Sequence, residues 1–108
     1  NNNPFISAYT SQVNLYVSAQ AKLQLTATEA TFTNHVLPVS DGTQNLGSSA
    51  KRWANVYTGD LHLSNEDKGA NEIDGTTGNW TIQEGAENLY IKNNKTGKKY
   101  KFALEEIQ

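Results

Sequence analysis

The sequence contains neither cysteine nor methionine, and each absence excludes something. Without cysteine the chain has no disulfide framework and no thiolate chemistry, which fits assembly in a reducing cytosol. Because there is no methionine, we expect that Asn1 is not a native start and that the chain was cut from a longer polypeptide. No apolar run approaches the roughly 20 residues that span a membrane, and residues 1–4 do not resemble a signal peptide. We therefore expect no membrane insertion.

An excess of either charge is also missing. The 9 basic and 11 acidic residues leave a net charge of -2, which is too weak a field to imply a nucleic acid or an anionic membrane as partner. Hydrophobic residues make up only 36% of the chain and charged residues 19%, and much of the rest is Asn, Thr, Ser, Gln and Gly. This balance favours strands and turns. Because no helix-length apolar periodicity stands out, the composition predicts an all-β fold.

Residues 13–27 alternate between apolar and polar side chains, which is the period of a β-strand. A single strand of that length would exceed the usual 3 to 10 residues. Instead, VNLYVSAQ and AKLQLTAT align as an eight-residue unit, with Leu15 matching Leu23 and Val17 matching Leu25. EATFTNHV reads as a degenerate third copy, because Phe32 shifts the apolar face by one position. We predict a repetitive β-shaft over residues 1–39.

The small apolar side chains of this segment cannot by themselves offset the entropy of ordering so many residues. They must then be buried against other chains or against stacked repeats, and symmetric copies of the same chain are the economical choice. The candidates for an interface between chains are Leu15, Val17, Leu23 and Leu25. Pro38 ends the repetitive part, because it cannot donate to a strand ladder.

Residues 40–63 form the junction between two kinds of pattern. Turns are expected at Asp41-Gly42 and Leu46-Gly47, after which Ser48 or Ser49 can cap one short helical turn over residues 50–53. The bulkiest cluster of the chain follows, and we predict that it holds neighbouring chains together. Its members are Trp53, Val56 and Tyr57, and a turn at Thr58-Gly59 then leads into a strand-like stretch over residues 60–63.

Residues 64–108 predict a small antiparallel β-meander. A polar, partly mobile loop over residues 64–79 precedes three alternating strands, over residues 80–83, 89–93 and 98–104. Gly97 supplies the positive φ that closes the hairpin turn at residues 94–97. One face would gather Trp80, Ile82, Leu89, Ile91, Tyr100, Phe102 and Leu104, and the other would carry Tyr90, Lys92, Lys99 and Lys101.

Residues 34–63 resemble the segment of bacteriophage tail fibres and tail spikes in which a repetitive β-shaft gives way to a distal domain. The matching residues are Pro38, Asp41, Gly42, Leu46, Gly47, Ser48, Arg52, Trp53, Val56 and Tyr57. Residues 78–107 further resemble the C-terminal tips of marine phage fibre-like proteins. The resemblance implies an intertwined homotrimer in the tail fibre of a virion, made in the host cytoplasm. In many relatives a self-cleaving chaperone domain follows the motif, and we expect that this chain has none.

The sequence offers no convincing chemistry. His35 and His62 lack a second ligand at metal spacing, and there is no catalytic serine motif, phosphate-binding loop or convincing carboxylate pair. We expect no enzyme activity, no metal and no cofactor. The lysines of the last hairpin suggest nucleic-acid binding, but lysines at alternate positions also protect a sheet edge from aggregation, and we favour that interpretation. The same surface could contact an anionic polysaccharide.

The hypothesis is therefore a structural and adhesive fibre segment, trimerising through shaft and junction. The tip would attach to a glycan or protein on the host surface, with no nucleic acid bound, through candidate contacts at Tyr90, Lys92, Lys99 and Lys101. Two alternatives stay open. One is a monomeric carbohydrate-binding module with its own core, and the other is a fragment of a polysaccharide-degrading tail spike.

Overall fold

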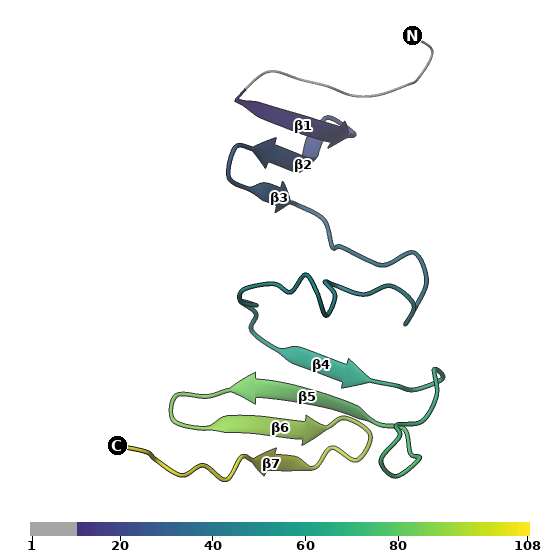
Figure 1. The fold of residues 1–108 in the computed structure, drawn as a ribbon, viewed down its shortest axis with the longest axis vertical. Coiled ribbons are helices and arrows are strands. Elements are labelled where there is room, and N and C mark those ends of the chain that lie inside the picture. Colours follow the sequence, from purple (N-terminus) through teal and green to yellow (C-terminus); the bar gives the residue numbers. More distant parts are fainter. Residues whose placement is uncertain (1–10) are drawn as a thin grey trace. The chain divides into compact units, whose positions relative to one another are not determined.

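The computed structural model describes residues 11–108, so the first ten residues of the predicted shaft lie outside the described range. The chain divides into two units, Asn1–Gln44 and Asn45–Gln108. Each unit holds one antiparallel β-sheet, and the described residues contain no helix (Figure 1). The all-β class is therefore confirmed.

The N-terminal sheet consists of β1 (Gln12–Val17), β2 (Gln20–Thr26) and β3 (Ala30–Phe32), in that order. Ser18 and Ala19 connect β1 to β2 with φ values of 51° and 62°. Two consecutive positive φ angles are the conformation of a tight hairpin turn whose twist matches the flanking strands. The two eight-residue units are thus the two arms of a hairpin, running in opposite directions side by side.

The register of this sheet gathers its apolar side chains on one face. Leu15 lies opposite Leu23, and Val13 lies opposite Leu25. Phe32 lies opposite Leu23 because β3 runs back antiparallel to β2, so its side chain shares their face despite its shifted position in the sequence. A register shift between Leu15 and Tyr16 places Ala21 opposite Tyr16 and interrupts the strict alternation that the sequence shows.

The predicted helical turn over residues 50–53 was wrong. Ser48 Oγ does accept a hydrogen bond from the Lys51 N–H at 3.0 Å, as a capping serine would. However, the Ser48 N–H donates to the Lys51 carbonyl at 3.0 Å, which is the reverse of the direction in a helix. Ser48 therefore closes a small loop. Trp53 packs beside Gly47, where an added Cβ would lie 3.3 Å from the indole Cδ1.

The C-terminal sheet consists of β4 (Leu61–Ser64), β5 (Asn79–Glu84), β6 (Leu89–Asn93) and β7 (Lys99–Lys101), in chain order (Figure 1). The last three overlap the strands expected from the sequence, although β7 covers only residues 99–101 of the 98–104 predicted. Residues 60–63, at the end of the junction, were expected to be strand-like, and β4 lies there; Leu61 lies opposite Ile82 and Leu63 opposite Trp80. The sheet therefore begins three residues before the predicted boundary at Ser64.

One face of this sheet is apolar, and we call it the apolar face. Its members follow from the strand register: Leu61, Leu63, Trp80, Ile82, Leu89, Ile91 and Tyr100. The rings of Trp80 and Tyr100 lie 5.9 Å apart. The Phe102 N–H donates to the Leu89 carbonyl at 2.9 Å, which extends the ladder beyond β7. Leu104, expected on this face, is 70% exposed.

No hydrophobic side chain is buried among the described residues. The single buried side chain is polar: Thr81, which is 2% exposed. A sheet buries its apolar face only against a second layer, and neither unit supplies one from its described residues. Within each unit, the apolar face of the sheet consequently has no covering layer among the described residues.

Gly97 offers a test of the last hairpin. Its φ is 76°, and its N–H donates to the Asn93 carbonyl at 2.8 Å. Gly97→Ala should cost about 1–2 kcal/mol of unfolding free energy, because a Cβ disfavours left-handed backbone. Gly59→Ala is the control, since Gly59 has no positive φ and its added Cβ would meet nothing within 4 Å. Thermal unfolding followed by circular dichroism should show a lower midpoint for Gly97→Ala only; equal midpoints would contradict the turn assignment.

Candidate functional site

The face of the C-terminal sheet opposite the apolar face carries polar side chains in two cross-strand rows, and we call it the polar face. In the first row the register aligns His62, Thr81, Lys92 and Lys99. In the second it aligns Gln83, Tyr90 and Lys101. Period-two alternation produces both faces at once, because a residue between two apolar-face residues must point the other way.

Thr81 anchors the first row. Its hydroxyl shares a hydrogen bond with His62 Nδ1 at 2.9 Å and accepts one from Asn94 Nδ2 at 2.9 Å. The Asn94 amide also donates to Asn79 Oδ1 at 2.9 Å. This network joins two strands, β4 and β5, to the hairpin loop between β6 and β7, and it covers Thr81. The polar face is therefore held by hydrogen bonds and has a defined shape.

The four predicted receptor contacts all lie on this face. Lys92 is directly opposite Lys99, and Tyr90 is directly opposite Lys101. Tyr90, Lys92 and Lys99 line a hollow of about 420 Å³ together with Gln83 and Ile91. The five residues belong to three neighbouring strands, β5, β6 and β7, and Ile91 lies between Tyr90 and Lys92 with its side chain on the apolar face. Their role in attachment stays a prediction.

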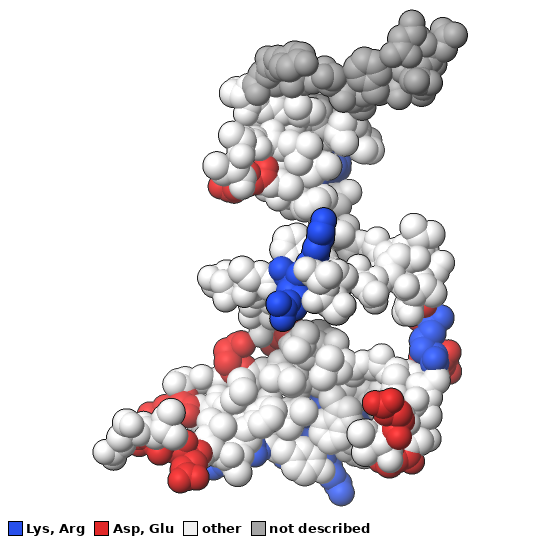
Figure 2. All heavy atoms as spheres, viewed as in Figure 1, with Lys and Arg blue, Asp and Glu red and all other residues white. Residues whose placement is uncertain are grey.

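Within residues 11–108 no salt bridge neutralises Lys92, Lys99 or Lys101. β7 is an edge strand, so Lys99 and Lys101 fit the interpretation that charge protects an exposed edge. Lys92 lies on β6, between β5 and β7, where no edge needs protection. Most of the surface in Figure 2 is uncharged, and both signs occur in the unit that contains this sheet.

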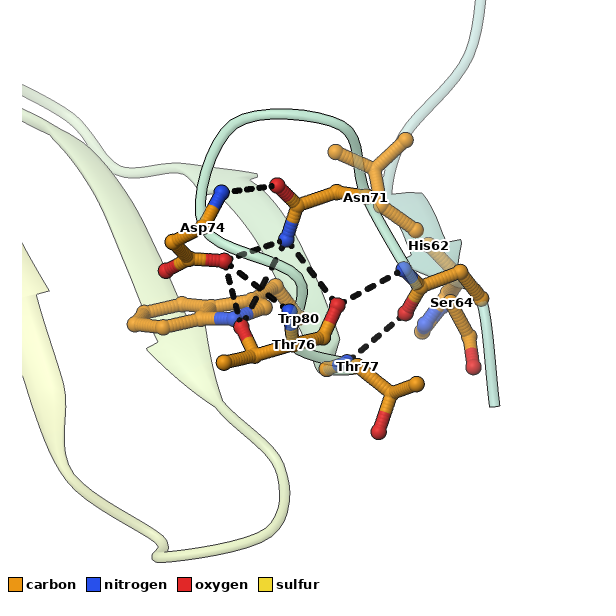
Figure 3. Close-up of a pocket in the computed structure, with 10 residues that line it drawn as sticks. His62, Ser64, Asn71, Asp74, Thr76, Thr77 and Trp80 are labelled. Atoms are coloured by element: carbon orange, nitrogen blue, oxygen red, sulfur yellow. Dashed lines mark hydrogen bonds between the residues drawn. The ribbon is translucent and has the colours of Figure 1, made fainter. Parts of the chain in front are cut away.

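A second hollow, of about 630 Å³, lies beside the loop between β4 and β5 (Figure 3). Asn71 organises this loop. Its Oδ1 accepts from the N–H groups of Ile73 and Asp74 at 2.8 and 3.0 Å, and its Nδ2 donates to Asp74 Oδ1 at 2.8 Å. The same Nδ2 donates to the Thr76 carbonyl at 2.9 Å. Side-chain amide bonds of this kind stabilise turns.

Asn65 ties the two ends of the loop. Its Oδ1 accepts from the Gly78 N–H at 2.7 Å, and its Nδ2 donates to the Thr76 carbonyl at 3.3 Å. Ile73, the one large apolar residue of the segment, is 89% exposed. The predicted loop is present, but amide side chains hold it. The Asn and Asp residues of the segment were the signal for this, and it was missed.

Hydrogen bonds lower the pKa of the Asp74 carboxyl below its ordinary value of 3.8, chiefly the bond from the Thr76 hydroxyl and then that from the Asn71 amide. The Thr76 hydroxyl donates to Asp74 Oδ1 at 2.8 Å, and the Thr76 N–H donates to the same oxygen at 3.1 Å. These bonds stabilise the ionised form. Asp74 therefore serves as a structural acceptor, which is a poor setting for a general acid.

The predicted interface residues are all accessible or half-buried. Leu15 is 47% exposed, and Val17, Leu25 and the half-buried Leu23 lie in the same sheet. Trp53 is 63% and Tyr57 92% exposed, and both lie with Val56 in the strandless segment before β4. Apolar side chains that large are available for contact with another chain.

The Asp74 geometry predicts a pH effect. A folded pKa below 3.8 means that the loop bonds contribute fully above that pH and are lost as the pH falls through the folded pKa. The amide resonance of Thr76 should titrate with a midpoint below 3.8 in NMR spectra. Asp74→Asn should abolish this titration, while the control Asp67→Asn, in the same loop, should preserve it. A midpoint at or above 3.8 would rule out the proposed bonding.

Within residues 11–108 no three His, Asp or Glu side chains form a group that could hold a metal ion. The described part of the chain also has no helix of the length and apolarity needed to cross a membrane. Comparisons with protein-family models, with curated proteins and with solved structures find no match to this chain.

Proposed function

We propose that this chain is a structural and adhesive segment of a phage tail fibre, in which three copies associate and present receptor-binding surfaces. The observation that carries the proposal is the lack of any buried hydrophobic side chain among the described residues. Large hydrophobic side chains of both units, among them Leu15, Trp53 and Leu63, are instead exposed. Such side chains are normally buried in a folded protein, and association with further copies can bury them.

Three groups of apolar residues are available for this burial. The first is the face of the N-terminal sheet with Leu15, Leu23 and Phe32, and the second is the apolar face of the C-terminal sheet. The third is the cluster around Trp53 and Tyr57. Because every copy carries all three, association of identical chains can cover them together.

The number three comes from the resemblance of residues 34–63 to the shaft-to-tip segment of trimeric phage fibres. One-sided sheets suit such an assembly, because three of them can enclose an axis with apolar faces inward and polar faces outward. The resemblance also implies that the protein belongs to a virion and is made in the host cytoplasm. The lack of cysteine is consistent with that route.

Adhesion follows from the polar face. A trimer displays three equal copies of it, and linked weak sites bind a repetitive surface far more tightly than one site does. The receptor would be a glycan or protein on the host cell. The monomeric carbohydrate-binding module is less favoured, because such a module needs a core that the described residues do not supply.

The first test is the oligomeric state. Sedimentation at micromolar concentration should give a trimer. Leu15→Ser with Leu23→Ser should dissociate it, because these two side chains lie on the apolar side of the N-terminal sheet. Asn14→Ser with Gln24→Ser is the matched control: the two residues are also directly opposite each other, one position along, and point to the other face. It should stay trimeric. A wild-type monomer that keeps its β-structure would refute the proposal.

The second test concerns Trp53. Trp53→Ala removes a large side chain from the proposed contact between chains and should cost about 2–4 kcal/mol of association free energy. The trimer should therefore dissociate at higher protein concentrations and melt at a lower temperature. Lys51→Ala, in the same loop, is the control. NMR should show the Asn93 to Gly97 hydrogen bond intact in both variants. An unchanged melting temperature for Trp53→Ala would mean that the chains are held together elsewhere.

A further inference from the structure

The pairing of Lys92 with Lys99 is unfavourable for the sheet. Like charges directly opposite each other on neighbouring strands destabilise the pair. Residues 89–104 contain five lysines and no acidic residue, so no carboxylate within this stretch offsets the repulsion. Protection of the β7 edge accounts for Lys99 and Lys101, but not for the half-buried Lys92 on β6. A bound anion would relieve this repulsion.

The surroundings of the pair are suited to a small polar ligand. The hollow of about 420 Å³ that Lys92 and Lys99 line also contains Tyr90, whose side chain is 40% exposed. An aromatic ring at the wall of a polar hollow can pack against the apolar face of a sugar. Gln83 donates its Nε2 to Asp60 Oδ2 at 3.2 Å, which leaves its carbonyl oxygen available as an acceptor for a hydroxyl group.

We propose that this hollow binds a carboxylate-bearing sugar of an acidic polysaccharide. The carboxylate would lie between the ammonium groups of Lys92 and Lys99, with the sugar ring against Tyr90 and a hydroxyl donating to Gln83. The inference deepens the proposed adhesive function and rests on it for the source of the ligand. The site itself lies within a single chain.

The mixed character of the polar face favours a sugar over a nucleic acid. Single-stranded nucleic acids take several aromatic platforms in succession along a basic groove. Tyr90 is the only aromatic residue in the two rows, since Tyr100 and Trp80 belong to the apolar face. A sugar with one carboxylate and several hydroxyls can use both donors and acceptors.

The same site stays accessible in the proposed trimer. Burial of the apolar face against other copies leaves the polar face, on the opposite side of the same strands, directed to solvent. Each copy would then present one hollow. A polysaccharide with repeated uronic acids could occupy more than one of them.

The test uses trigalacturonate, a short ligand that occupies one site, titrated into the full chain and followed by NMR. Resonances of Tyr90, Lys92 and Lys99 should shift, and the neutral trisaccharide maltotriose should leave them unchanged. Lys92→Gln and Lys99→Gln should each raise the dissociation constant about threefold to fivefold, the upper range for one accessible ion pair. The matched control Lys51→Gln, also a lysine outside the hollow, should leave it unchanged.

Three results would overturn the inference. They are the absence of binding at millimolar trigalacturonate, an equal loss in Lys51→Gln, and tighter binding of a single-stranded DNA oligonucleotide of the same charge. Because the ligand occupies one chain, the measurement does not depend on trimer formation. Sedimentation of the same sample separates the two questions: a monomer that binds trigalacturonate keeps the site and rejects the trimer, and a trimer that does not bind it does the reverse.

Discussion

Each sheet of this protein has one apolar face and no second layer to cover it within the described residues. Apolar surface left in water opposes folding of the isolated chain, so this single constraint governs the rest of the structure. In the proposed assembly the apolar faces contact other chains, which leaves the opposite faces available to bind a ligand. The two sides of the C-terminal sheet can therefore serve different purposes, because alternation along each strand sends apolar side chains to one face and polar side chains to the other.

With no core of its own, the C-terminal unit has its local shape set by polar side chains. The Thr81 hydroxyl accepts a hydrogen bond from Asn94 and shares another with His62, while hydrogen bonds of Asn65 and Asn71 close the loop between β4 and β5. Such bonds are directional, so they define geometry even where they add only about 1 kcal/mol each to stability. The abundance of Asn and Thr in the composition thus has a structural purpose. Apolar burial would supply the stability, and amide networks the precision.

The sequence predicted the strands better than their connections. Alternation over residues 13–27 predicts strands whichever way they pair. The hairpin that makes β1 and β2 antiparallel needs positive φ at Ser18 and Ala19, and neither is a Gly or Asn that would predict such a turn. β4 is only four residues long and is defined by its pairing with β5. The capping pattern at Ser48 fitted a helical turn and an open loop equally well.

On the polar face, alternation placed Tyr90, Lys92, Lys99 and Lys101 together correctly, because register preserves period two. It could not show that Lys92 would lie directly opposite Lys99, since that depends on the length of the hairpin loop.

This register is what separates a solvated charge from a candidate site. Ile91 and Asn93 lie on the apolar side, so position 92 must point to the polar face. The fold therefore requires only that residue 92 be compatible with that face, and it does not require a charge. Thr81, in the same row, shows that an uncharged side chain serves the sheet well and can even be buried. A lysine at position 92 instead lies opposite the positive charge of Lys99, on a central strand of the sheet. No buried apolar core among the described residues offsets the cost of that repulsion. The fold alone does not explain that choice, and an anionic ligand held between the two ammonium groups does.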